Sequence, residues 1–164
     1  MSTTAFNGEA VNTKGNFPVT GDKISGLNLT KTDLSSLTEE DLKGKKVVFN
    51  IFPSVDTGVC AMQLKTFSSK LKDREDVVLL FASLDLPFAL SRFCGAEGIE
   101  NAVTTSDFKH RCLENHGLLM TDGALNGLYA RAVIVLDEEQ NVIHSELVSD
   151  ITIEPNYDEA LKFI

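Results

Sequence analysis

The three cysteines are the residues most able to do chemistry in this chain, and Cys60 has the most suggestive surroundings. It ends the loop FPSVDTGVC and begins a predicted helix. The unpaired N–H groups and the dipole of a helix N-terminus favour an anion, so they raise the thiolate fraction of a cysteine placed there. A lone cysteine is more often a buried structural residue. Thr57, Pro53 and a position at the carboxyl end of a strand favour a reactive thiol instead.

Cys94 is the second candidate, at the end of a short predicted helix that Gly95 terminates. A disulfide between Cys60 and Cys94 needs Cα atoms within about 7 Å of each other, which requires local unfolding of this helix. On spacing alone, the favoured interpretation of Cys94 is a small apolar core residue beside Phe93.

Cys112 lies between His110 and His116, which raises the question of a metal site. Such a site needs three or four ligands at suitable spacing, and neither C-x-x-C nor H-E-x-x-H occurs here. We therefore predict no metal site and interpret Cys112 as a bystander thiol.

Arg131 stands near the start of an otherwise apolar strand, residues 130–136. A buried cation at this point is costly unless it meets an anion. The strand supports two interpretations about equally: a surface arginine at a strand end, or an arginine that faces a thiolate.

The elements that would position these residues alternate between strands and helices. A buried strand (47–52), a helix with an apolar face (60–74) and a second buried strand (76–83) form a βαβ unit with parallel strands. Alternating elements and a terminal antiparallel hairpin predict an α/β sandwich around a mixed sheet. The other predicted elements are an N-terminal hairpin (3–6 and 9–13), helices at 85–95, 106–115 and 156–164, and a hairpin of strands 130–136 and 142–148.

Composition limits the classes of protein to consider. The 164 residues suit one globular domain spanning 1–164, and a net charge of −9 disfavours nucleic acid and anionic membrane surfaces as partners. The apolar runs are too short to cross a bilayer. The odd number of cysteines and an N-terminus, MSTTAF, without the features of a secretory signal predict a cytoplasmic protein.

Several segments together resemble one known family. Pro53, Thr57 and Cys60 fit P-x-x-x-T-x-x-C, the active-site motif of the peroxiredoxins. The runs NIFPSVDTGVC (50–60) and DLPFALSRFCGAEG (85–98) are similar to the thiol peroxidase subfamily. The Arg131 strand, the strand after it and the N-terminal hairpin also match, so the resemblance covers nearly the whole chain.

The resemblance implies a thioredoxin-like three-layer sandwich, in which helices flank a mixed central sheet, with residues 1–16 as an N-terminal β-hairpin extension. It implies an atypical two-cysteine peroxidase in which Cys60 attacks the peroxide and Cys94 resolves the product as an intramolecular Cys60–Cys94 disulfide. Thr57 and Arg131 would complete the peroxide-binding site, and Pro53 would shield it. The implied partners are hydrogen peroxide or organic hydroperoxides, thioredoxin as reductant and a second copy in a homodimer, with no cofactor.

Three departures from the family pattern stand out: residues 22–29 lack the usual proline, residues 123–127 differ from the usual loop, and Cys112 has no counterpart. Phe52 and Phe88 are predicted to be the apolar neighbours that would suit an alkyl hydroperoxide. The alternative function is a thioredoxin-fold redox-sensing chaperone or interaction module without peroxidase turnover. A thioredoxin-type oxidoreductase would need the C-x-x-C pair that Cys60 lacks.

Overall fold

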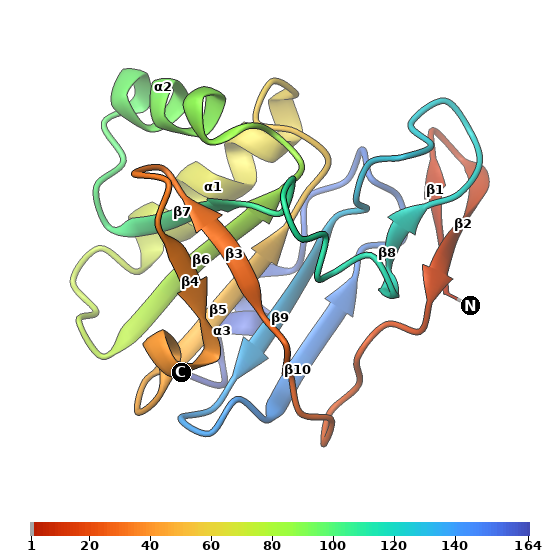
Figure 1. The fold of residues 1–164 in the computed structure, drawn as a ribbon. Coiled ribbons are helices and arrows are strands. Elements are labelled where there is room, and N and C mark those ends of the chain that lie inside the picture. The colour runs from red at the N-terminus through yellow and green to blue at the C-terminus, as the bar shows by residue number, and fades with distance from the viewer. Residues whose placement is uncertain (1) are drawn as a thin grey trace.

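A mixed seven-stranded sheet forms the centre of the computed structural model, which describes residues 2–164 (Figure 1). The strand order is β10-β9-β5-β6-β7-β3-β4, with β5, β6 and β7 parallel and the other pairings antiparallel. This is the predicted α/β fold with a mixed sheet. The strands are β3 (Asn28–Lys31), β4 (Ser36–Thr38), β5 (Lys46–Ile51), β6 (Val77–Ser83), β7 (Ala102–Ser106), β9 (Ala132–Leu136) and β10 (Val142–Leu147).

The central strands are buried on both faces, which is why their sequences are continuous apolar runs rather than alternating ones. Every residue of β9 is buried, as are five of the six residues of β5. Alternate side chains then point into two separate cores: Val48 and Val133 into one, Phe49 and Ile134 into the other. At the end of β5, the chain leaves this buried sheet in the loop 52–57, which carries Pro53 and Thr57.

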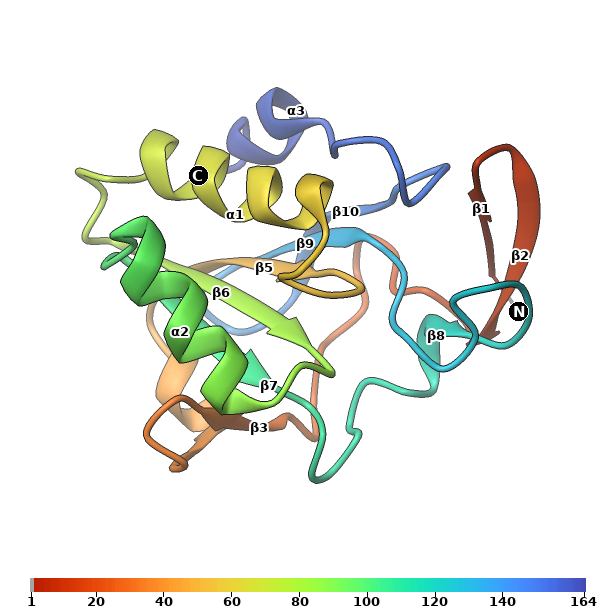
Figure 2. The ribbon, with the colours of Figure 1, turned by 90° about the horizontal axis from the view of Figure 1, so that it is seen from above.

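The helices α1 (Gly58–Lys70), α2 (Pro87–Glu97) and α3 (Tyr157–Leu161) all contribute to one of these cores. In Figure 2, α1 and α3 lie side by side, and the rings of Phe67 and Tyr157 meet between them. The core on the other face includes Leu29, Leu113 and Tyr129, which lie in strands and loops. One 3₁₀ turn, η1 (Glu39–Leu42), lies before β5.

The predicted helix over residues 106–115 is wrong: the chain there forms turns after β7. The buried carboxylate of Asp107 accepts hydrogen bonds from the main-chain N–H groups of Cys112 and Leu113 at 2.9 Å and from the Tyr129 hydroxyl at 2.6 Å. Arg111 also has a φ of 49°, which a helix excludes. A side chain that binds its own main chain in this way competes with helix formation.

The predicted stop of α2 at Gly95 is also wrong. The helix continues to Glu97 and ends at Gly98, whose left-handed φ of 67° is the usual helix-terminating conformation of glycine. Cys94 therefore lies inside the helix, and its carbonyl accepts the N–H of Ile99 at 3.1 Å. The terminal helix α3 is shorter than predicted and begins after Asn156, which caps it by accepting from Glu159 N.

The predicted N-terminal hairpin is present as β1 (Thr3–Phe6) and β2 (Glu9–Gly15). Its turn residues Asn7 and Gly8 both have positive φ, as a two-residue hairpin turn requires. β2 also pairs with β8 (His116–Met120), which the sequence did not predict, and the three strands stand apart from the main sheet in Figure 1. The hairpin and β8 therefore form a second, smaller sheet beside the seven-stranded sheet.

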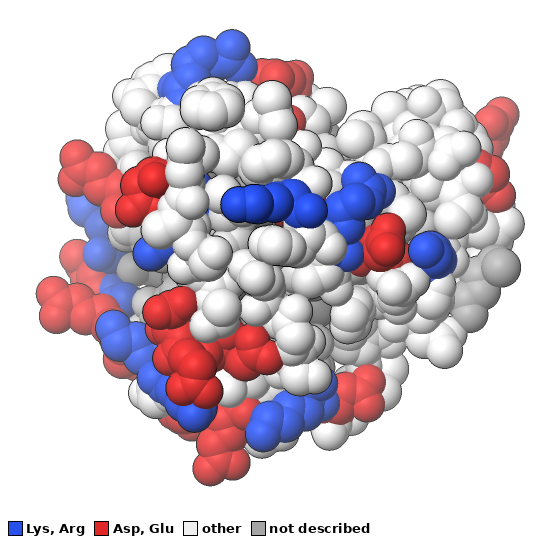
Figure 3. Space-filling view, viewed as in Figure 1, with Lys and Arg blue, Asp and Glu red and all other residues white. Residues whose placement is uncertain are grey.

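Within residues 2–164, no helix combines the length and the apolar character that crossing a bilayer requires. The face shown in Figure 3 carries acidic side chains gathered at its lower left and basic side chains in separate groups. This distribution agrees with the acidic composition of the chain.

Candidate active site

Cys60 lies in the first turn of α1, directly after the loop that joins β5 to this helix. Its side chain is fully buried, and two polar groups reach its sulfur. Thr57 Oγ1 donates to Cys60 Sγ at 2.8 Å, and Arg131 Nη2 donates to it at 3.2 Å. The structure thus brings Arg131, which is distant in the sequence, and Thr57, which is three residues before Cys60, to the same sulfur.

Thr57 is placed by the start of the helix. It is the residue before α1, with an extended backbone, and its hydroxyl also lies 3.1 Å from the carbonyl oxygen of Ser54. A hydroxyl has one proton, so it donates either to Ser54 O or to the sulfur. Thr57 can therefore accept a hydrogen bond from a Cys60 thiol in one state and donate one to the thiolate in the other.

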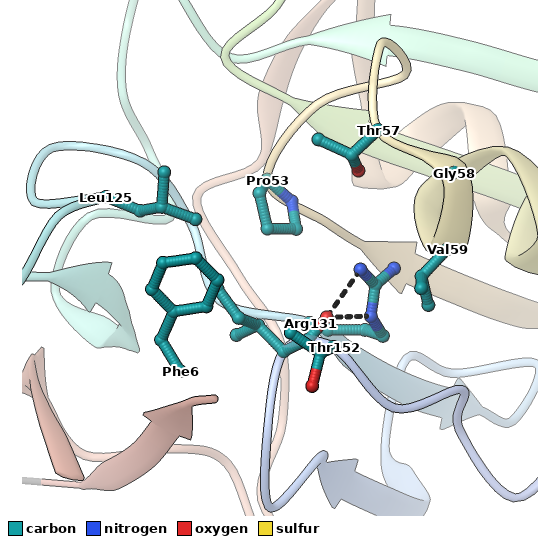
Figure 4. A pocket seen from close by; sticks show the side chains of 9 residues that line it. Phe6, Pro53, Thr57, Gly58, Val59, Leu125, Arg131 and Thr152 are labelled. Atoms are coloured by element: carbon teal, nitrogen blue, oxygen red, sulfur yellow. Dashed lines mark hydrogen bonds between the residues drawn. The ribbon is translucent and has the colours of Figure 1, made fainter. Parts of the chain in front are cut away.

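Arg131 is buried, with 2% of its surface exposed, which decides between the two interpretations of this residue. Its Nε and Nη2 atoms donate to the carbonyl oxygen of Ile151 at 3.0 and 2.8 Å, drawn as dashed lines in Figure 4. Nη1 donates to Gln63 Oε1 at 2.9 Å. Because the guanidinium is a planar fork, these contacts fix the direction in which Nη2 meets the sulfur.

A cavity with about 370 Å³ of empty space opens at this group (Figure 4). Arg131, Thr57 and Thr152 supply its polar side chains, and most of the remaining wall is apolar. The cavity is open enough for a small molecule to reach the polar groups beside Cys60. The lining residues are Phe6, Pro53, Thr57, Gly58, Val59, Leu125, Arg131, Ile151 and Thr152.

The apolar wall comes from other residues than the predicted Phe52 and Phe88. Phe52 is fully buried in the core against Phe81, and Phe88 is 66% exposed and lies outside the lining. Phe6 from the N-terminal hairpin and Leu125 from the loop before Arg131 take that place. Both lie far from Cys60 in the sequence, so no local pattern pointed to them.

A buried polar network behind Arg131 was not predicted from the sequence. Gln63 and Asn50 are both fully buried, and Gln63 Nε2 donates to Asn50 Oδ1 at 3.0 Å. The available signals were a polar residue inside the apolar strand around Asn50 and a glutamine three residues after Cys60, on the buried face of the helix.

Asp85 holds the loop before Cys60. Its carboxylate accepts from Ser54 Oγ at 2.7 Å, Val55 N at 2.9 Å and Ser83 Oγ at 2.6 Å. Asp85 thus links this loop to the segment that leads into α2.

Cys94 lies away from Cys60, and all three cysteines are free thiols. Cys94 Sγ is 3.8 Å from Thr104 Oγ1 on β7, whereas Cys60 meets Arg131 beside β9. Strands β5 and β6 lie between β7 and β9 in the sheet, so the two sulfurs contact residues from different parts of it. Burial raises the pKa of the Cys94 thiol, and the Thr104 hydroxyl opposes that shift.

Cys112 has a different environment. Its sulfur lies 3.3 Å from Asp107 Oδ1. Burial, with this carboxylate beside it, raises the pKa of Cys112 to about 12. Across residues 2–164, no group of three or more His, Cys, Asp or Glu side chains is arranged to hold a metal ion.

Comparison with known proteins places this site in a family. The model of the Redoxin family matches residues 13–161, a range that includes Thr57, Cys60 and Arg131. The chain belongs to the Redoxin family. A thiol peroxidase of Corynebacterium glutamicum is 45% identical over 161 residues, covering 98% of both chains. A thiol peroxidase of Vibrio cholerae is 46% identical over 160 residues, covering 97% of this chain and 98% of the relative.

Solved structures of other proteins share the fold. A peroxiredoxin-like protein from Aquifex aeolicus has a TM-score of 0.94 at 36% identity and covers 99% of this chain and 95% of its own. A thiol peroxidase from Chromobacterium violaceum has a TM-score of 0.90 at 21% identity, covering 98% and 94%. The thioredoxin-like fold and the resemblance to thiol peroxidases are confirmed. The chain is a peroxidase of the oxidoreductase class that uses a thiol to reduce peroxide.

Proposed function

We propose that Cys60 is the residue that attacks the peroxide. The observation that carries this proposal is the pair of donors on one sulfur, Thr57 Oγ1 at 2.8 Å and Arg131 Nη2 at 3.2 Å, beside a cavity. A guanidinium and a helix N-terminus both stabilise an anion, so they favour the thiolate, which is the nucleophilic form of cysteine.

The reaction is a displacement at oxygen. The Cys60 thiolate forms an S–O bond with the terminal peroxide oxygen, the O–O bond breaks, and the leaving oxygen takes up a proton to become water or an alcohol. Cys60 becomes a sulfenic acid. Negative charge moves from sulfur to the leaving oxygen, and Thr57 and Arg131 are preorganised donors for that charge. Pro53, which lines the same cavity, would shield the sulfur from bulk water.

The substrates proposed are hydrogen peroxide and organic hydroperoxides. The polar end of either molecule would meet Thr57 and Arg131. The organic part of the larger substrate would lie against Phe6 and Leu125, which line the same cavity. Residues 1–164 would act as one peroxiredoxin domain, with the 1–16 hairpin supplying a wall of the site.

Cys94 is proposed as the resolving residue. Its thiol would attack the Cys60 sulfenic acid, form the Cys60–Cys94 disulfide and release water, before further oxidation of Cys60. Because Cys94 lies inside α2 and contacts Thr104 on β7, away from Cys60, α2 would partly unwind to bring the two sulfurs together. Few fixed contacts oppose this change: α2 has two buried residues, and its ion pairs, Arg92 with Asp56 and Glu97 with Lys65, lie at the surface.

Recycling requires an external dithiol, and we propose thioredoxin. Exchange would pass two electrons to the disulfide and return both cysteines to thiols. The reducing cytoplasm would supply that dithiol, and the working form would be a homodimer. The catalytic steps proposed here use protein groups and this dithiol alone.

The test is NADPH oxidation coupled through thioredoxin reductase and thioredoxin, with hydrogen peroxide and cumene hydroperoxide as alternative substrates. We expect turnover with both peroxides and a Cys60–Cys94 linkage in the oxidised protein by peptide mapping. The variant Cys94→Ser should form a sulfenic acid on Cys60 and fail to turn over. A Cys60–Cys112 linkage in the oxidised wild-type protein would contradict the assignment of Cys94.

A further inference from the structure

Gln63 is a buried side chain that the reaction described above leaves without a role. It lies three residues after Cys60 on α1, is fully buried, and accepts from Arg131 Nη1 through Oε1 at 2.9 Å. We propose that Gln63 is a positioning residue. Its neutral amide holds the guanidinium of Arg131 in place without neutralising it, so that the positive charge acts on Cys60. This inference rests on the proposed function of Cys60 and deepens it.

The orientation of the Gln63 amide is dictated by the sheet behind it. Asn50 Nδ2 donates to the main-chain carbonyls of Val48 and Leu80 at 3.3 and 3.4 Å. Carbonyl oxygens only accept, so the oxygen of Asn50 must point the other way, toward Gln63 Nε2 at 3.0 Å. Gln63 Nε2 also lies 3.5 Å from the carbonyl oxygen of Ala132. The oxygen of Gln63 is therefore the atom that faces Arg131.

This order of donors and acceptors leads from β5 to the reactive sulfur. Asn50 is on β5, and Gln63 is on α1, the helix that carries Cys60. Arg131 directly precedes β9, the strand that pairs with β5 on the side opposite β6. Each of the three side chains is at most 2% exposed. Buried polar groups that are fully hydrogen-bonded are rigid, so the network fixes the guanidinium against the sheet.

The charge around Arg131 shows why a neutral amide matters. Its acceptors are the carbonyl oxygen of Ile151, Gln63 Oε1 and Cys60 Sγ. Within residues 2–164, no ion pair joins Arg131 to a carboxylate. Tyr157 on α3 is another ionisable group near this charge, and burial raises the pKa of Tyr157, which keeps it neutral at neutral pH. In this part of the chain, a Cys60 thiolate is the anion that Arg131 meets.

A carboxylate in place of the amide would change this balance. It could accept from Arg131 in the same geometry, but it would add a negative charge within hydrogen-bond distance of the guanidinium. In the protein interior such a charge is weakly screened, so it would oppose formation of the nearby thiolate. Geometry would be kept while the charge acting on Cys60 is reduced.

The experiment compares Gln63→Glu and Gln63→Met with the wild-type protein. Alkylation of the Cys60 peptide by iodoacetamide is followed as a function of pH without peroxide, and the rate of reaction with hydrogen peroxide is measured separately. For Gln63→Glu we expect the alkylation profile to move to higher pH and the peroxide rate at neutral pH to fall about 10-fold or more. Gln63→Met, which adds no charge, should give a smaller shift in the same direction.

Two further variants separate the proposed effect on Cys60 from a general loss of folding. Ser69→Glu adds the same charge to an exposed position of α1 and should leave the alkylation profile unchanged. Asn50→Leu removes the acceptor that orients Gln63 and should shift the profile in the same direction as Gln63→Met. Folded Gln63→Met and Asn50→Leu proteins with wild-type profiles would overturn the proposal, because a purely structural role would lower stability alone. If Cys60 were not the peroxide-reactive residue, its peroxide reaction would be absent in the wild-type protein, while the alkylation series would still test the link from Gln63 to Arg131.

Discussion

Cys60 and Cys112 are two thiols withdrawn from solvent in one small protein, and they meet opposite neighbours. The sulfur of Cys60 receives hydrogen bonds from a hydroxyl and a guanidinium. The sulfur of Cys112 lies 3.3 Å from the carboxylate of Asp107. Cys60 is the more deeply buried of the two. Burial raises the pKa of Cys112, and the carboxylate of Asp107 adds to that rise, whereas the hydroxyl and guanidinium donors at Cys60 stabilise an anion.

The two environments also differ in origin. The neighbours of Cys60 come from the loop before α1 and from the residue before β9, so the pairing of β5 with β9 brings them together. The neighbour of Cys112 belongs to its own turn, where Asp107 binds two main-chain N–H groups and Tyr129. The carboxylate that holds that turn also contributes to the raised pKa of Cys112.

Exchange of each cysteine for serine gives the largest expected contrast. Cys60→Ser should reduce peroxidase turnover to the background of the coupled assay, because a serine hydroxyl is not ionised at neutral pH. Cys112→Ser should keep turnover close to that of the wild-type protein. Equal loss in both variants, with both proteins folded by circular dichroism, would remove the distinction between the two thiols.

Removal of the cation should give the next largest effect. Arg131→Met keeps much of the side-chain volume and deletes the donors that reach Cys60 and Ile151. We expect the second-order rate constant with hydrogen peroxide to fall about 10²–10³-fold, as for the loss of one preorganised donor in a buried site. Stopped-flow measurement of sulfenic acid formation checks this, and a loss below about 3-fold would contradict the role given to Arg131.

Asp107→Asn tests the other half of the comparison. It removes the negative charge beside Cys112 while keeping a side chain of similar shape, so the pKa of Cys112 should fall and its alkylation at mildly alkaline pH should become faster. The variant should also lose about 1–3 kcal/mol of unfolding free energy, because an amide cannot satisfy all the N–H and O–H donors that meet Asp107. Urea denaturation and peptide-resolved alkylation measure the two effects. Unchanged alkylation of Cys112 in the folded variant would refute the role of the carboxylate.

The smallest expected effect is on stability at high pH. Folding raises the pKa of Cys112 to about 12, whereas an unfolded cysteine ionises near pH about 8.5. The stabilising contribution of the protonated thiol is therefore complete below pH about 8.5 and is lost as the pH rises toward 12. Urea midpoints should fall between about pH 8 and about pH 10 by more in the wild-type protein than in Cys112→Ser. Parallel curves for the two proteins would show that this thiol does not contribute.

The sequence was sufficient to predict β5, α1, β6, β9, β10 and the first hairpin, because these elements depend on local patterns, whereas β3, β4, β7 and β8 were not predicted. Continuous apolar runs identified β5, β6 and β9, and the asparagine–glycine turn identified the first hairpin. The turns after β7 were not predicted, because a single buried carboxylate overrides the helical preference of residues 106–115. The end of α2 was misplaced because two glycines, Gly95 and Gly98, offer equivalent local signals.

The neighbours of the reactive sulfur were predicted only in part. Thr57 precedes Cys60 by one helical turn, so it could be associated with the sulfur from spacing alone. Arg131 could not be placed from its strand, because a surface position and a buried one fit the local sequence equally. Phe6 and Leu125 reach the cavity only when the second sheet docks beside the first, which depends on long-range packing.

Arg131 is anchored by a main-chain carbonyl, that of Ile151, which accepts two of its hydrogen bonds. Every amino acid supplies such a carbonyl, so a point mutation at position 151 leaves the anchor present while the backbone path is kept. The side chain of the same residue lines the cavity. Substitutions at position 151 can therefore change the shape of the cavity without changing the position of the cation beside Cys60. Evolution, or a directed library, could vary the first property while the second is kept.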